Sequence, residues 1–361
     1  MPVIAQKPSL VGMTRAEIAE ALGDRPGAGW RARQIAGWIY GKAAATYEEM
    51  RDLPLAMRRQ LEADFAINSL QVSRHATSTD GVQKLLVHGG DGEVFECVLL
   101  PYGDRTSCCI SSQVGCPMGC TFCATGLGGF DRNLSAGEIV GQYLLLQGLS
   151  ESRISHVVFM GMGEPLLNLK NVLKALRLLH EEVGLSYRHL TISTVGLVPQ
   201  IRELAKEKLP IHLALSLHSP FDEIRERLMP VNKKWPVAET IAAMKDYQRA
   251  TGRKITIEYL LIKEVTDTLD QARELARLVK GTPTLVNVIP FNYVDTEQGF
   301  ARPERERVRA FKQELKRLGV NVSERIERGH DIAAACGQLA GQHQGRLSQR
   351  RKLSELPVLS S

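Results

Sequence analysis

Short apolar segments alternate with amphipathic segments from about residue 105 to residue 320. Apolar runs that predict strands occupy residues 156–161, 190–194, 211–218, 255–262 and 284–292. Helical periodicity lies between them, at residues 169–183 and 269–281. Strands that are apolar on both faces are typical of a parallel sheet covered by helices. The pattern predicts an α/β fold, with an open or closed (β/α) barrel as the expected architecture and the chemistry on loops after strand C-termini.

The first 95 residues have a different pattern. Helical periodicity occurs in residues 14–23, 31–42 and 53–65, and two strand-like runs follow at 83–89 and 93–101. Thr14 and Glu17 have the spacing of a capping box. We therefore expect three parts: a small helical and β accessory domain at 1–95, the barrel core at 96–340, and a C-terminal tail at 341–361.

Charge and cysteine content narrow the class of protein. The net charge is +6, and residues 301–361 carry the excess, with thirteen Lys and Arg against seven Asp and Glu. Such a tail suits a polyanion or is a solvated terminus. Five of the seven cysteines fall between residues 108 and 123, which favours metal ligation or thiol chemistry over a disulfide framework. Because no apolar run of about 20 residues and no secretory leader pattern occurs, we expect a cytoplasmic protein without membrane spans.

The strongest local motif is Cys116-Pro-Met-Gly-Cys120-Thr-Phe-Cys123. Soft thiolates select zinc or iron–sulfur centres, and a structural zinc normally takes four protein ligands. A zinc site completed by Cys109 or by a distant histidine is one interpretation. The other is a [4Fe–4S] cluster on three cysteines, which leaves one iron open.

This CxxxCxxC motif resembles the signature of the radical S-adenosylmethionine (SAM) superfamily. The resemblance implies that the open iron binds SAM and that the cluster cleaves SAM to a 5′-deoxyadenosyl radical. It also implies that a glycine-rich turn binds the SAM amino group, and Gly163 and Glu164 follow the strand at 156–161. On residue type alone that turn is equally a plain strand-to-helix turn.

Polar residues end several of the predicted strands. They are Ser193, Ser216-Leu217-His218 and Asn292. Each one alone is commonly a cap or turn residue. In a barrel, however, the carboxyl ends of parallel strands meet around one site. We therefore expect this set, together with Gly163 and Glu164, to bind the cofactor.

Several motifs in order resemble the RlmN/Cfr family of RNA methyltransferases. They are the stretches 109–116, 129–135, 161–165, 216–220 and 329–339. The resemblance implies a radical-SAM partial (β/α) barrel with an N-terminal accessory domain. It implies methylation of carbon 2 of an adenine in 23S rRNA, and of tRNA as well, with Cfr-like methylation at carbon 8 as the alternative. A zinc-stabilised RNA-binding module without catalysis is the alternative from another class.

The same resemblance assigns roles to three further residues. Cys336 carries a methyl group as S-methylcysteine, Cys109 resolves the RNA adduct through a transient disulfide with Cys336, and Glu96 accepts the adenine proton. Two SAM molecules are consumed per turnover, one as methyl donor and one as radical source. From residue type alone, Cys336 is a buried structural thiol and Glu96 a surface glutamate of a strand. A flavodoxin-type electron donor and a monomeric state complete the expectation.

Overall fold

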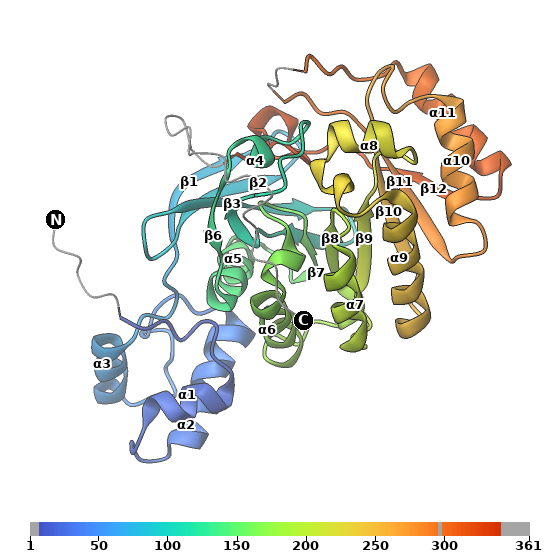
Figure 1. Cartoon of the computed structure of the whole chain (residues 1–361). Helices are drawn as coiled ribbons and strands as arrows, with labels where there is room; N and C mark the ends of the chain where they lie inside the picture. The colour runs from blue at the N-terminus through green and yellow to red at the C-terminus, as the bar shows by residue number, and fades with distance from the viewer. Residues whose placement is uncertain (1–6, 295–297, 341–361) are drawn as a thin grey trace.

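The computed structural model describes residues 7–294 and 298–340 and has a curved ten-stranded sheet at its centre (Figure 1). The strand order is β1-β2-β3-β4-β7-β8-β9-β10-β11-β12. The strands from β4 through β7 to β12 pair in parallel, whereas β1, β2, β3 and β4 pair antiparallel. The predicted α/β class and parallel sheet are confirmed.

The strands have these bounds: β1 Gln71–Thr77, β2 Gln83–His88, β3 Val94–Pro101, β4 Thr106–Cys109, β5 Gln113–Gly115, β6 Phe130–Asn133, β7 Ile154–Phe159, β8 Leu190–Thr194, β9 His212–Ser216, β10 Ile255–Leu261, β11 Thr284–Pro290 and β12 Asn321–Glu324. The seven strands expected from apolar runs are all present within a few residues of their predicted positions. Five strands were not predicted. Strand β1 was missed because its residues are almost all exposed and carry no hydrophobic pattern, and β4, β5, β6 and β12 have only three or four residues each.

The helices have these bounds: α1 Arg15–Leu22, α2 Ala28–Ala36, α3 Leu55–Asp64, α4 Ala124–Leu127, α5 Ala136–Leu149, α6 Leu169–Glu181, α7 Val198–Lys206, α8 Asp222–Leu228, α9 Val237–Thr251, α10 Leu269–Val279 and α11 Arg305–Arg317. Helices α5, α6, α7 and α9 follow one another along the outer face of the sheet (Figure 1). Each crossover helix buries its apolar stripe there, and the opposite face of the sheet is left for the site.

The helices α1 to α3 form a small unit beside α5 and α6 (Figure 1). The capping box predicted at Thr14 and Glu17 is present at the start of α1. The Glu17 carboxylate also pairs with Lys174 of α6 at 2.6 Å, and Arg15 pairs with Glu182 at 2.7 Å. These ion pairs and a buried apolar core dock the unit on the barrel.

Strands β1 to β3 extend the barrel sheet, so the expected boundary after residue 95 runs through β3. Near the opposite edge, the Arg328 guanidinium, four residues beyond β12, donates to the carbonyl of Pro101 at the end of β3. This contact links the segment after β12 to the end of β3. The predicted tail at 341–361 lies outside the described residues. Within the described part of the chain, no helix has the length and apolar character needed to cross a membrane.

Candidate functional site

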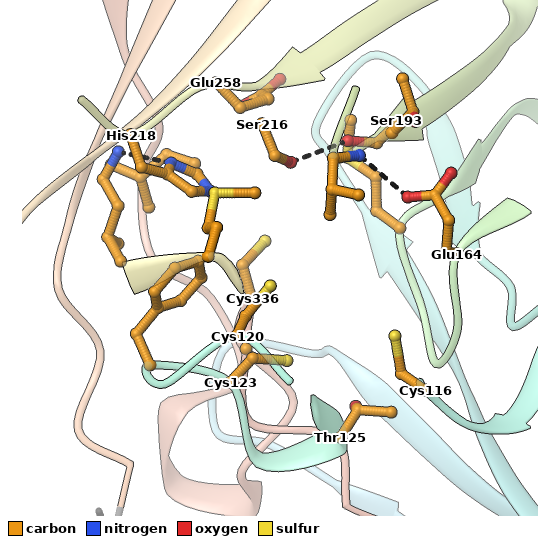
Figure 2. Close-up of a pocket in the computed structure, with 18 of the residues that line it drawn as sticks. Cys116, Cys120, Cys123, Thr125, Glu164, Ser193, Ser216, His218, Glu258 and Cys336 are labelled. Carbon is orange, nitrogen blue, oxygen red and sulfur yellow. Dashed lines mark hydrogen bonds between the residues drawn. The ribbon is translucent and has the colours of Figure 1, made fainter. Parts of the chain in front are cut away.

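The three cysteines of the motif border one pocket at the carboxyl edge of the parallel strands (Figure 2). Cys116 directly follows β5, and its backbone N–H donates to the Gly129 carbonyl at 2.6 Å. Cys123 immediately precedes α4, and Cys120 lies in the turn between them. The pocket has an empty volume of about 950 Å³. In the folded chain the three thiols of the motif therefore face one pocket.

The arrangement of the triad fits a cluster better than a single ion. Burial raises the pKa of Cys116 and Cys120 above the ordinary thiol range, and neighbouring thiols raise it further. Bare thiolates are therefore unfavourable here, and binding to iron would stabilise them. Among the described residues, no three His, Cys, Asp or Glu side chains could hold one metal ion. Zinc needs four ligands around one point, whereas each thiolate of a cubane binds a separate iron.

The turn after β7 holds Gly163 and Glu164 against the wall of the pocket. Gly163 has φ +100°, and a Cβ atom there would lie 2.5 Å from Cβ of Gln113, so only glycine fits. The Glu164 carboxylate accepts hydrogen bonds from the N–H of Leu166 at 3.0 Å and of Val195 at 2.8 Å. Figure 2 draws the second of these bonds. Burial nevertheless raises its pKa to about 7. A cationic ligand would favour the ionised carboxylate.

Ser193 and Ser216 stand side by side at the ends of β8 and β9, with their hydroxyl oxygens 3.4 Å apart. Both border the pocket. Leu217 is fully buried and does not border it. Its N–H instead donates to the Glu258 carbonyl at 3.1 Å, so this residue fixes the backbone beside Ser216.

His218 and Asn292 also border the pocket. His218 has φ +60°, and its Nδ1 accepts a hydrogen bond from the Leu260 N–H at 3.0 Å. Burial lowers the pKa of His218 to about 3, so the imidazole is neutral and its Nε2 carries the proton. Asn292 donates to the Cys336 carbonyl at 3.2 Å, while its own Oδ1 is buried without a partner among the described residues.

Cys336 comes to the same pocket on a loop that is held from three sides. Asn292 binds its carbonyl, Ala124 in the cluster segment donates to the Gly337 carbonyl at 2.8 Å, and Lys84 of β2 donates to the Ala333 carbonyl at 3.0 Å. More than two hundred residues separate this cysteine from the cluster motif in the sequence. The loop contacts place Cys336 beside the cluster motif in the folded chain.

Cys109, at the end of β4, shares a second pocket with Cys336. This pocket has an empty volume of about 620 Å³. Burial raises the pKa of Cys109 to about 12, the nearby Cys336 thiol adds to the increase, and Arg325 opposes it. The structure therefore brings together the two cysteines expected to exchange a disulfide. Both are free thiols.

Glu96 borders neither pocket. On β3 it shares a face with Val98 and Leu100, which border the second pocket. Its carboxylate lies 3.0 Å from Nζ of Lys84 and accepts the N–H of Ala340 at 2.9 Å. Through Lys84 and Ala340, Glu96 supports the loop that carries Cys336.

Two arginines of the site were not anticipated from the sequence. Arg225 of α8 is fully buried, and its guanidinium donates to the carbonyls of Val195, Ser216 and Leu217 at 2.6, 3.3 and 3.1 Å. Arg325 borders both pockets. No sequence pattern distinguishes either arginine, because both lie among other charged residues in segments whose composition is typical of a protein surface.

The curved parallel sheet with a three-cysteine loop at its carboxyl edge defines a radical SAM protein. The sequence model of the radical SAM superfamily matches residues 110–279, and the model of the ribosomal RNA large subunit methyltransferase N-terminal domain matches residues 9–67.

Individual relatives extend the match to nearly the whole chain. The chain is 49% identical to a probable dual-specificity RNA methyltransferase RlmN of Thermus thermophilus, over 87% of this chain and 90% of that protein. It is 46% identical to the protein of the same name from Symbiobacterium thermophilum, over 93% of each. A crystal structure of a radical SAM methyltransferase from Sphaerobacter thermophilus superposes with a TM-score of 0.89 and 42% identity, covering 93% of this chain and all of that one. The chain belongs to the RlmN family.

Proposed function

We propose that this protein methylates carbon 2 of adenine in RNA through a methyl group carried on Cys336. The observation that supports this most directly is the position of Cys336. Its thiol borders the pocket of the cysteine triad and, on its other side, the pocket that contains Cys109. A methyl carrier needs access both to the cofactor and to a resolving thiol. At its position in the loop, Cys336 has access to both.

Cys116, Cys120 and Cys123 would hold a [4Fe–4S] cluster, and Glu164 would accept hydrogen bonds from the amino group of SAM. When bound, these cofactors supply the methyl group and the carbon-centred radical that functionalises it. The chain contributes a pocket with a mostly apolar lining, which disfavours water beside reactive species. His218 remains neutral throughout the physiological range and can only donate from Nε2. Two SAM molecules would be consumed in each turnover.

Release of the product is the step in which the two cysteines act together. The RNA adduct is joined to the Cys336 sulfur through a methylene carbon. The Cys109 thiolate attacks that sulfur, the S–S bond forms, and the S–C bond breaks with its electron pair passing to carbon. The carbon then takes a proton and becomes the methyl group. The high pKa of Cys109 means that a base must remove its proton first.

The substrate assignment rests on the relatives, which are named dual-specificity RNA methyltransferases. We propose adenines of 23S rRNA and of tRNA as the two substrates, a flavodoxin-type electron donor, a monomeric enzyme and a cytoplasmic location. The target base must leave its stack to reach a pocket inside the sheet. Mass spectrometry of rRNA fragments tests the regiochemistry: a methyl group found only at carbon 8 would contradict the proposal.

The Cys109→Ala variant tests the thiol pair. Without the resolving thiol, the methylene link between RNA and Cys336 cannot be broken, so anaerobic turnover should leave a covalent protein–RNA adduct on denaturing gels. Cys108→Ala is the matched control, because Cys108 is buried on the other face of β4 and borders neither pocket. Normal turnover by Cys109→Ala would refute the resolving role.

Glu96→Gln tests the proposed proton acceptor. As an acceptor, Glu96 acts after the adduct forms, so the variant should accumulate adduct while methylation of Cys336 proceeds at the wild-type rate. As a support for the loop through Lys84 and Ala340, it would instead slow Cys336 methylation as well. Mass spectrometry of the Cys336 peptide, with and without RNA, separates the two roles.

A further inference from the structure

Basic side chains gather at the amino ends of neighbouring parallel strands. Strands β4, β7, β8, β9 and β10 are adjacent and parallel, so their amino ends share one edge of the sheet, opposite the edge of the cysteine triad. Each of these strands brings at least one basic residue to this edge, within two positions before the strand or among its first three residues. The members are Arg105 at β4, Arg153 and His156 at β7, Arg188 and His189 at β8, His212 at β9, and Arg253 and Lys254 at β10. We call this set the amino-edge row.

Carboxylates balance little of the charge of this row. Arg188, Arg253 and Lys254 make no ion pair within the part of the chain that the structure describes, and Arg105 lies 3.8 Å from its neighbour Asp104. The side chains of Arg105, Arg188 and Lys254 are exposed. Exposed cations without carboxylate partners produce a positive potential, which attracts an anion from outside the chain.

Two stacked histidines lie within the row and respond to its charge. The rings of His156 and His189 have their centroids 4.2 Å apart. Burial lowers the pKa of His156, His189 and Arg105 lower it further, and Asp104 opposes them. An anion bound at this edge would raise that pKa, because it would stabilise the imidazolium form.

His212 shows the same effect two strands away. Burial lowers its pKa, Arg253, Lys254 and His156 lower it further, and a backbone hydrogen bond with Arg188 opposes them. Because a guanidinium can only donate, Nε2 of His212 accepts the hydrogen bond from Nη2 of Arg253 at 2.9 Å. The positive charge of the row therefore favours the neutral form of this histidine as well.

A cleft continues the row toward the N-terminal unit. Residues 40–43 form one side of the cleft, and the end of α5 together with Arg153 forms the other. Its empty volume is about 1140 Å³. Lys42 adds an exposed cation, and Glu151 offsets part of the charge. Arg153 belongs to both the cleft and the amino-edge row, so the two are contiguous.

The length and position of the row favour RNA over an acidic protein as the partner. Neighbouring strands lie about 4.8 Å apart, so the row is about 19 Å long from β4 to β10, which suits several consecutive phosphates. Strand β7 has six residues and is therefore about 20 Å long. An acidic electron donor docked at this edge would be separated from the cluster by that length, across which electron transfer is slow. RNA needs no such proximity, because its backbone extends beyond the target base.

We propose that the amino-edge row is a second RNA-binding surface, at which Arg188, Arg253 and Lys254 bind phosphates of the substrate RNA outside the stem-loop of the target adenine. This surface rests on the proposed function, because it assumes that RNA is the substrate. The histidines of the row take up protons when the phosphates bind. Since the row lies one strand length from the reacting groups, it contributes affinity for long RNA rather than reaction rate.

Binding of two RNAs by the full chain tests the assignment. Fluorescence anisotropy compares a domain-length fragment of 23S rRNA with a stem-loop that contains only the target adenine and its closing stem. The combined substitutions Arg188→Gln, Arg253→Gln and Lys254→Gln should weaken binding of the long fragment by roughly tenfold to hundredfold and of the stem-loop by less than about twofold. The slope of log affinity against log salt should become shallower by about 2–3 for the long fragment, since each phosphate contact contributes about 0.7–0.9.

The matched control removes the same charge elsewhere on the surface. Lys170→Gln, Arg202→Gln and Arg309→Gln change exposed side chains of α6, α7 and α11, and together they should leave binding of the long fragment as in the wild type. Equal weakening by the two triple variants would show an effect of net charge and overturn the assignment. Equal weakening of the two RNAs by the first variant, with its fold verified by circular dichroism, would overturn it as well.

A second measurement uses the histidines of the row. Affinity for the long fragment should rise as pH falls toward the ordinary imidazole pKa of about 6.5, by up to about tenfold per pH unit for each proton taken up. His156→Gln, His189→Gln and His212→Gln together should remove most of that dependence, and its full retention would overturn the role of the histidines.

Two further results separate this surface from other assignments. Slower reduction of the reconstituted cluster by flavodoxin in the Arg188, Arg253 and Lys254 variant, with unchanged RNA binding, would overturn the proposal in favour of an electron-donor surface. Wild-type protein that binds neither RNA would instead refute the proposed function itself.

Discussion

Arg225 offers a direct test of how the site is held together. Its guanidinium joins the segment after β8, through the Val195 carbonyl, to the end of β9, through the carbonyls of Ser216 and Leu217. A fourth bond, at 2.7 Å, goes to Oδ1 of Asn232. Val195 in turn donates to the Glu164 carboxylate. Replacing Arg225 by methionine keeps the apolar stem and removes every donor.

The expected loss of unfolding free energy follows from comparing the contribution of these hydrogen bonds with the cost of burying the guanidinium. Hydrogen bonds from a charged donor contribute about 1.5–3 kcal/mol each, and four of them are lost. Removing the buried cation also removes its desolvation penalty of several kcal/mol, and this offsets part of the loss of stability. Burial at this position already lowers the pKa of Arg225 to about 10, which is consistent with such a cost. The net destabilisation of the Arg225→Met variant should be about 3 kcal/mol.

Two assays measure the result. Urea unfolding of the cluster-free chain should show the loss of stability, and calorimetric titration of the reconstituted chain should show SAM affinity at least tenfold weaker. Arg225→Lys should retain only part of the wild-type stability and of the SAM affinity, because one ammonium group cannot reach three separated carbonyls. Arg227→Met on the exposed face of the same helix is the matched control and should change stability by less than about 0.5 kcal/mol. Arg225→Met with wild-type stability and SAM affinity would refute the reasoning.

The turn at residues 163 and 164 gives two further predictions. Gly163→Ala forces a left-handed φ on an L-residue and a Cβ contact of 2.5 Å with Gln113, so unfolding free energy should fall by about 2–4 kcal/mol. Gly148→Ala, with open space at its Cβ, should be neutral or slightly stabilising, and equal losses in both would contradict the steric argument. The pKa of Glu164, about 7 when folded against an ordinary 4.5, means that the folded chain binds the extra proton between those values. The contribution of Glu164 to the unfolding free energy of the cluster-free chain is therefore largest below pH 4.5 and should fall by up to about 3 kcal/mol as pH rises through 7. Glu164→Gln should abolish that decline in urea titrations, and an unchanged slope in the variant would assign it to other groups.

The hydrophobic pattern of single segments was enough to predict the positions of most parallel strands in the barrel. Strand β8 begins and ends where its run predicts, and its burial alternates with the period of a strand, since Leu190, Ile192 and Thr194 are buried and the residues between them only partly so. The capping box of α1 was equally readable, since both of its hydrogen bonds join Thr14 and Glu17, which are only three residues apart. Strand β1 escaped because its side chains are exposed on both faces.

By itself the sequence determined the cysteine triad and the glycine turn, because each is a short segment whose chemistry is complete within a few residues. The tertiary structure decided which distant residues meet. Cys336 reaches Cys109 and the triad because three separate elements bind its loop. Glu258 joins Ser216 and Asn287 because strand register places them at one level. Periodicity reports how each element is buried, whereas register and loop contacts depend on the packing of the whole sheet, and no single segment carries that information.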